Sequence, residues 1–114
     1  MTLRFREPRE KDEKYLKRVR QLPCLVCGDD TTTEAAHIRY ADRTVCKRQT
    51  GMAEKSDDKY AVPLCGECHR EQHMGNEFEW WQEQGVDPVK TALALYVNRD
   101  DPETCLVICA NARQ

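Results

Sequence analysis

The sequence predicts a small α+β domain, and three observations carry that prediction. The chain has 114 residues, 39% hydrophobic and 33% charged, so one domain of this size has little apolar material for its core. Two short apolar segments lie among longer segments with helical periodicity. Seven cysteines include two Cys-x-x-Cys pairs, which can supply the stability that the core lacks.

The first half of the chain predicts one helix and two strands. Residues 9–21 place Tyr15, Leu16 and Val19 near one helical face, and Pro23 ends that helix. Residues 34–38 form a segment short enough for a strand, and the largely apolar residues 60–64 are typical of a second strand. The polar segment 39–57 between them has no periodicity, and a loop of this length in a small domain is usually functional or disordered.

The second half predicts helices. Residues 66–74 open a helix that Gly75 closes, residues 76–84 form a second, and residues 87–97 form a third that begins at Asp87-Pro88. Trp80 and Trp81 have the spacing of core residues on the second of these. Residues 99–114 are expected to be a tail with room for one short element at 103–110.

The two Cys-x-x-Cys pairs, Cys24 with Cys27 and Cys65 with Cys68, are separated by 37 residues. Two residues between thiolates allow both sulfurs to reach one ion, and two such pairs complete the tetrahedral shell that zinc prefers. The closed shell predicts a structural Zn²⁺ without chemistry of its own. The alternative is a redox pair or reduced core thiols.

The three other cysteines carry a weaker signal. Cys46 stands alone in the long polar segment, whereas Cys105 and Cys109 share a helical face. Small apolar fillers or free thiols are the better interpretation for all three. The chain has no run of about 18 apolar residues and no apolar stretch near Met1, so we expect neither a membrane span nor a secretory signal. A cytoplasmic, reducing compartment follows as an expectation.

The net charge of −2 hides an asymmetry. Residues 1–20 contain eight Lys/Arg and four Asp/Glu, and residues 39–48 contain four Lys/Arg and one Asp. From residue 67 onward there are nine Asp/Glu and four Lys/Arg. The basic half could face phosphates, and an unevenly charged solvated surface is the alternative.

The three histidines form the second candidate site. His69 and His73 stand at i and i+4 on a predicted helix, so both imidazoles leave one face and could hold one metal ion. Cys68 directly precedes His69 and anchors that helix. His37, on the strand before the long segment, is the natural third member.

These residues resemble a known family. About residues 22–75 resemble the HNH endonucleases. The resemblance rests on a Cys-x-x-Cys turn (a zinc knuckle), a strand with His37, a loop, a strand ending Val62-Pro63-Leu64-Cys65, and a helix carrying Cys68-His69-x3-His73. The run Gly51-Met52-x2-Lys55-x2-Asp58-x-Tyr60-x-Val62-Pro63-Leu64-Cys65 is similar to the phage and prophage group that contains the RecA-dependent recombination-enhancement nuclease. The resemblance implies a zinc-stabilised ββα-metal (His-Me finger) core with flanking helices.

The resemblance also implies residue roles. His37 would be the general base that deprotonates water, and His69 and His73 would hold one divalent ion (Mg²⁺, Mn²⁺ or Zn²⁺) at the scissile phosphate. Tyr60 stands where the family has its Asn, which orients the base, and Ala36 stands where a further ligand is common. Glu34 and Asp58 are candidates for a third ligand, and water can complete the shell.

Basic residues around the loop are the candidate nucleic-acid contacts: Arg39, Arg43, Lys47, Arg48 and Lys55. A solvated loop is the alternative for the first four, and a buried salt bridge with Asp58 is the alternative for Lys55. Hydrolysis of a phosphodiester needs a base that works near neutral pH, and histidine suits that task.

The sequence therefore predicts a metal-dependent endonuclease acting on DNA, phage or prophage encoded, in a bacterial host cell. We expect a basic helical extension at 1–21, a nuclease core at 22–75, packing helices at 76–98 and the tail at 99–114. A recombinase filament or another phage or host protein is a further candidate partner, and oligomeric state is left open. The alternatives are a catalytically degenerate zinc module that binds nucleic acid or protein, and a redox or metal-sensing protein.

Overall fold

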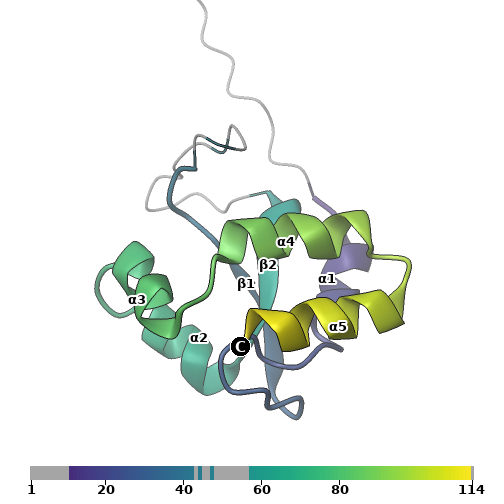
Figure 1. The fold of residues 1–114 in the computed structure, drawn as a ribbon, viewed down its shortest axis with the longest axis horizontal. Coiled ribbons are helices and arrows are strands. Elements are labelled where there is room, and N and C mark those ends of the chain that lie inside the picture. The colour runs from purple at the N-terminus through teal and green to yellow at the C-terminus, as the bar shows by residue number, and fades with distance from the viewer. Residues whose placement is uncertain (1–10, 43, 45–46, 48–56, 114) are drawn as a thin grey trace, which may run out of the picture.

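The computed structural model describes residues 11–42, 44, 47 and 57–113. Within them, five α-helices surround a two-stranded antiparallel sheet (Figure 1). The predicted α+β class is confirmed. None of the described helices has the length and apolar content needed to cross a bilayer.

The sheet joins β1 (Thr33–His37) to β2 (Ala61–Cys65), with Thr33 opposite Cys65 and His37 opposite Ala61. A short 3-10 turn, η2 (Asp58–Tyr60), leads into β2, and β2 continues without a loop into α2 (Gly66–Gln72). Every residue of β2 is buried, because helices cover both of its faces. The register places Cys65 at one end of the sheet and His37 at the other.

Helix α1 (Glu13–Val19) lies against the sheet through its apolar side. Tyr15, Leu16 and Val19 are buried as the periodicity predicts, and the Tyr15 hydroxyl donates to the Ala61 carbonyl of β2 at 3.1 Å. Asp12 caps the helix by accepting from the Tyr15 amide. The described helix is therefore shorter than the predicted 9–21.

Helices α3 (Glu77–Gln84) and α4 (Pro88–Val97) match the predicted segments 76–84 and 87–97. Asn76 caps α3, and Gly85 ends it at φ +71°, a left-handed conformation that favours glycine. Helix α4 packs on β2 and η2 (Figure 1). Trp80 and Trp81 are both buried, which confirms them as core residues.

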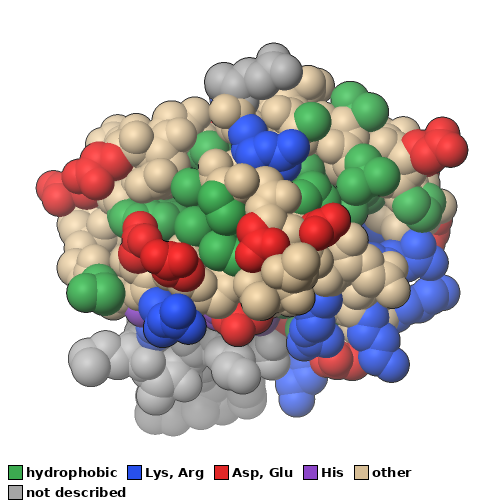
Figure 2. Space-filling model, turned by 90° about the horizontal axis from the view of Figure 1, so that it is seen from below, with side chains coloured by type: hydrophobic (Ala, Val, Ile, Leu, Met, Phe, Trp, Pro, Cys, Tyr) green, Lys and Arg blue, Asp and Glu red, His purple; other side chains and the backbone are tan. Residues whose placement is uncertain are grey.

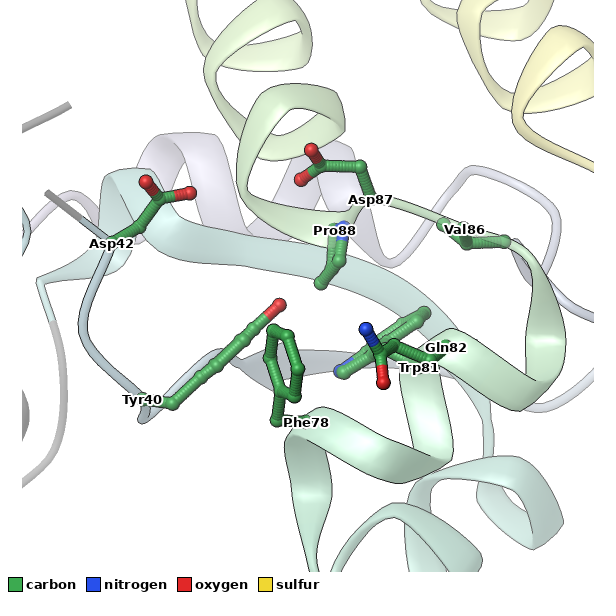
Figure 3. A pocket seen from close by; sticks show the side chains of 8 residues that line it. All are labelled: Tyr40, Asp42, Phe78, Trp81, Gln82, Val86, Asp87 and Pro88. Atoms are coloured by element: carbon green, nitrogen blue, oxygen red, sulfur yellow. The ribbon is translucent and has the colours of Figure 1, made fainter. Parts of the chain in front are cut away.

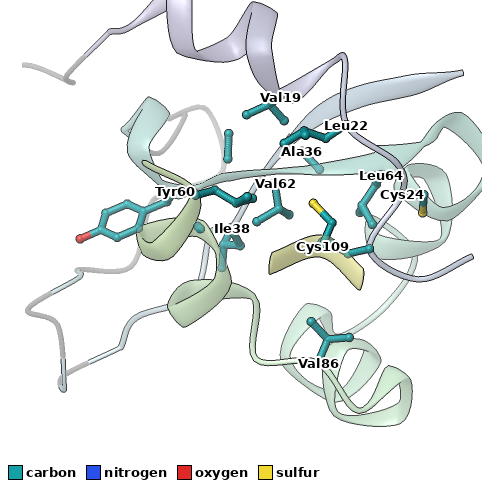
Figure 4. Packing of buried hydrophobic residues seen from close by; sticks show 14 of the residues in the cluster. Val19, Leu22, Cys24, Ala36, Ile38, Tyr60, Val62, Leu64, Val86 and Cys109 are labelled. Atoms are coloured by element: carbon teal, nitrogen blue, oxygen red, sulfur yellow. The ribbon is translucent and has the colours of Figure 1, made fainter. Parts of the chain in front are cut away.

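The segment expected to be a tail contains an 11-residue helix, α5 (Pro102–Ala112), which packs on α4. Its buried face carries Cys105 and Cys109, and Cys109 lies among the core side chains of the sheet (Figure 4). Burial raises the pKa of both thiols, that of Cys109 to about 12. These two cysteines are core fillers, as their spacing predicts. The Arg113 guanidinium, one residue beyond α5, reaches the Cys24 carbonyl at 3.4 Å.

Candidate functional site

The four cysteines of the two Cys-x-x-Cys pairs come together at one end of the sheet. The sulfur atoms of Cys24, Cys27, Cys65 and Cys68 all lie within 4.8 Å of one another, and those of Cys27 and Cys65 are 3.6 Å apart. Sulfurs bound tetrahedrally at the usual zinc distance are about 3.8 Å apart. The predicted thiol cluster is confirmed, and it could hold a structural metal ion such as zinc.

Backbone contacts set each half of the cluster. The Leu25 amide donates to the Pro63 carbonyl at 3.0 Å, which ties the first knuckle to β2. Gly28 closes that knuckle at φ +80°, a conformation that an L side chain rarely adopts. In the second half, Cys65 caps α2 and its sulfur accepts from the Cys68 amide at 3.4 Å. The knuckles are thus shaped by the chain around them.

The histidine pair lies on α2 and at its end. The Nε2 atoms of His69 and His73 face each other at 3.2 Å. Two nitrogens bound to one ion at about 2.1 Å are about 3.0–3.4 Å apart, for angles from octahedral to tetrahedral. The pair therefore has the spacing of two ligands to one ion.

Glu34 of β1 orients this pair. Its Oε1 lies 2.7 Å from Nδ1 of His69, so the proton of His69 belongs on Nδ1 and Nε2 carries the lone pair that faces His73. A carboxylate on the far nitrogen of a metal-binding imidazole is a recurrent outer-shell contact. Glu34, weighed above as a third ligand, is placed instead as the partner that fixes one of the two. Among the described residues, no third side chain joins the pair at ligand distance.

The pKa of His73 is lowered, first by partial removal from water and then by the neighbouring His69. Arg39 lowers it further, whereas Glu77 raises it. The neutral imidazole is the metal-binding form, so His73 is held in the form that a ligand needs. Arg39, a predicted phosphate contact, accordingly lies near the pair.

His37 ends β1 and contacts Asp58 of η2, with 2.9 Å between Nε2 and Oδ1. Asp58 is 2% exposed, and its Oδ2 accepts from the Asp12 amide at 2.6 Å. The carboxylate is therefore fixed from two sides. With the Nε2 proton directed at Asp58, Nδ1 is the atom of His37 that can accept a proton. Asp58 was named above as a candidate metal ligand or as a partner of Lys55, which lies outside the described residues; the described residues show its contact with His37.

A buried amide connects His37 to the helix that carries the pair. Gln72 is 2% exposed, and its Nε2 donates to the His37 carbonyl at 3.3 Å and to Glu77 Oε2 at 3.0 Å. Glu77 also accepts from the Trp81 indole and from the Arg39 amide. The end of β1 is thereby held against the last turn of α2, next to His73. Neither Gln72 nor Glu77 belongs to a motif or spacing that marks it in the sequence.

Tyr60, predicted to take the place of the family Asn, is 7% exposed, and the ammonium of Lys47 lies 5.1 Å from its ring centroid. Its carbonyl accepts from the Ile38 amide at 3.0 Å, one residue after His37. Tyr60 thus contacts the strand through its backbone, and Asp58 is the side chain bonded to the imidazole.

Lys47, predicted to contact phosphate, is 4% exposed, and its ammonium donates to the Tyr40 carbonyl at 2.7 Å. This buried ammonium is therefore not presented on the surface where a phosphate would bind. Arg43, Cys46, Arg48 and Lys55 lie outside the described residues. In the view from below, Lys and Arg side chains gather towards one side and acidic groups lie among apolar patches elsewhere (Figure 2).

One comparison identifies a family. Residues 2–100 match a family model described as a protein of unknown function (DUF968). The chain belongs to the DUF968 family. No curated protein and no solved structure gave a match.

Proposed function

We propose that this DUF968 protein is a metal-dependent endonuclease of the HNH type that hydrolyses phosphodiester bonds in DNA. The observation that carries the proposal is the facing pair of Nε2 atoms on His69 and His73, 3.2 Å apart and oriented by Glu34. The pair lies beside the strand end that carries the Asp58-bound His37. The order β1, β2, α2 is the order that the resemblance requires.

His37 supplies the base. Its Nδ1 accepts a proton from the attacking water, and the buried Asp58 carboxylate stabilises the imidazolium that forms. Asp58 cannot swing away because the Asp12 amide holds its other oxygen. The proton is passed to solvent as His37 returns to its neutral form.

His69 and His73 would hold the divalent ion, with water and substrate oxygens completing the shell. An ion at this place supplies positive charge to the scissile phosphate and to the leaving oxygen. Arg39 adds a fixed positive charge beside His73. The four thiols play a separate part, since a closed sulfur shell holds the fold and leaves no position for substrate.

A zinc module that binds nucleic acid or a protein without cutting is the second candidate. Ala36 favours it, because this fully buried methyl group stands where the resembling family often has a metal ligand. Such a module would slow the migration of a plasmid in a gel but leave it supercoiled.

Plasmid nicking tests the proposal. The full chain should nick supercoiled plasmid with Mg²⁺ or Mn²⁺ and stop in EDTA. His37→Ala should keep its zinc and fold but lose about 10²–10⁴-fold in rate, as expected for a general base. His73→Ala should regain part of its activity as Mn²⁺ is raised, whereas His37→Ala should not. Equal cutting by His37→Ala and wild type would remove the base assignment, and DNA binding without cutting by wild type would favour the zinc module.

A further inference from the structure

A pocket of about 270 Å³ opens between the segment after β1, helix α3 and the start of α4 (Figure 3). Three aromatic side chains line it: Tyr40, Phe78 and Trp81. The proposed hydrolysis uses none of these three.

The described residues that line this pocket carry negative charge and no positive charge. Asp42 and Asp87 lie at its rim, and none of the described residues that line it is basic. The Oδ1 of Asp42 accepts from the Thr44 amide, and that of Asp87 from the Lys90 amide. In both carboxylates the structure gives Oδ2 no donor among the described residues. Two acceptors thus remain for a guest.

The pKa of Tyr40 is raised, first by burial and then by the carboxylates of Glu77, Asp87 and Asp42. Its hydroxyl therefore stays protonated, and the neighbouring carboxylates add to the effect of burial. A phosphate or any other anion is therefore disfavoured here.

The rings do not form a flat slot. Tyr40 and Phe78 contact each other with centroids 5.3 Å apart and planes tilted by 59°, so no planar base fits between them. Phe78 is half exposed, and Trp81 closes the inner end, where its indole nitrogen is already bonded to Glu77. Tilted aromatic faces with carboxylates at the rim are suited to a compact cation, because ring faces attract positive charge.

We propose that this pocket binds a compact organic cation, an alkylammonium group such as that of a polyamine or of a lysine side chain. The positive charge lies against the rings, and the carboxylates of Asp42 and Asp87 attract it. The inference is independent of the proposed nuclease activity and goes beyond it.

Choline and its uncharged isostere 3,3-dimethyl-1-butanol test the charge requirement at constant shape. Each is titrated into the full chain in 0.15 M NaCl, and the fluorescence of the two tryptophans, of which Trp81 lines the pocket, is followed. Choline should saturate, and the isostere should bind at least about 10-fold more weakly, because it lacks the charge that the rings and carboxylates attract. Putrescine and Nα-acetyl-lysine amide then distinguish a free polyamine from a lysine side chain.

The double variant Asp42→Asn, Asp87→Asn removes both charges, and Asn replaces Asp well as the cap of α4. It should weaken choline binding about 10-fold or more. Phe78→Leu removes one half-exposed ring and should weaken binding as well, which provides a second test if the double variant unfolds. Glu83→Gln makes a matched change on an exposed part of α3 outside the pocket and should leave binding within about twofold.

Equal binding of choline and the isostere, or no saturable binding of any of the cations, would overturn the proposal. So would unchanged binding by both pocket variants. Cytidine or adenosine binding more tightly than choline would assign the pocket to a nucleobase instead.

Discussion

Replacing Cys27 by alanine separates a metal-bound thiolate from an ordinary thiol. Cys27 is exposed, whereas Cys105 is buried and lies outside the sulfur cluster. Burial alone therefore predicts that Cys105→Ala costs more stability than Cys27→Ala. A metal in the cluster predicts the reverse.

The magnitudes differ enough to be measured. A structural zinc contributes about 10–16 kcal/mol of apparent binding energy in small peptides, so one thiolate of four carries about 3 kcal/mol. An exposed substitution without a metal changes stability by about 0.5 kcal/mol at most. Cys105→Ala removes one buried sulfur, which costs about 1–2 kcal/mol. At about 4 °C per kcal/mol for a domain of this size, Cys27→Ala should lower Tm by about 12 °C and Cys105→Ala by about 6 °C.

Thermal unfolding followed by circular dichroism, together with elemental analysis of zinc, checks this prediction. Wild type and Cys105→Ala should each carry one zinc per chain, and Cys27→Ala should carry less. A Cys27→Ala protein that unfolds at the wild-type temperature, or a wild-type protein that never acquires zinc, would refute the reasoning.

Three further substitutions test the histidine site. Glu34→Gln should weaken metal binding by the histidine pair about 10–100-fold, because it removes the carboxylate that holds His69. Calorimetric titration with Mn²⁺ measures this affinity. The control Glu67→Gln, on the exposed side of α2, should leave it unchanged. Asp58→Asn should cut the nicking rate by about 10–100-fold without loss of zinc, since Asn cannot stabilise a charged His37; a rate equal to wild type would contradict the role of Asp58. Gln72→Leu leaves the His37 carbonyl without its amide donor and should cost about 1–3 kcal/mol in urea unfolding; an unchanged midpoint would mean that the amide contact carries no stability.

Local signals in the sequence were enough for the two strands, for helices α2, α3 and α4, and for the sulfur cluster. Spacing alone selected Cys24, Cys27, Cys65 and Cys68, because a knuckle needs only two residues between its thiols. Caps and breakers such as Asn76 and Gly85 located the later helices to within a residue or two.

Contacts between distant segments could not be read in the same way. Glu34 meets His69 across 35 residues, and which strand residue faces α2 depends on a register that the long connection does not encode. The partners of Asp58 and Gln72 could not be predicted either, because a single polar residue forms no repeating pattern that shows which segment it contacts. The length of α5 was not predicted, because its buried face carries the small residues Cys105 and Cys109, whereas the larger apolar residues Leu106 and Val107 are exposed.

Helix α2 has only seven residues, which is far below the length at which a helix is stable alone in water. Its first turn carries Cys68 and its second carries His69 and ends at His73, so one short element serves both candidate ions. An ion on the thiols would suppress local unfolding of α2 and would thereby raise the affinity of the proposed histidine site for its ion. Because such coupling is reciprocal, an ion on the histidines would in turn strengthen the binding of the ion on the thiols. The two sites would then be coupled allosterically. Oxidation of one of the four clustered thiols would release its ion, let α2 fray, and so lower the affinity of the histidine pair for its own ion.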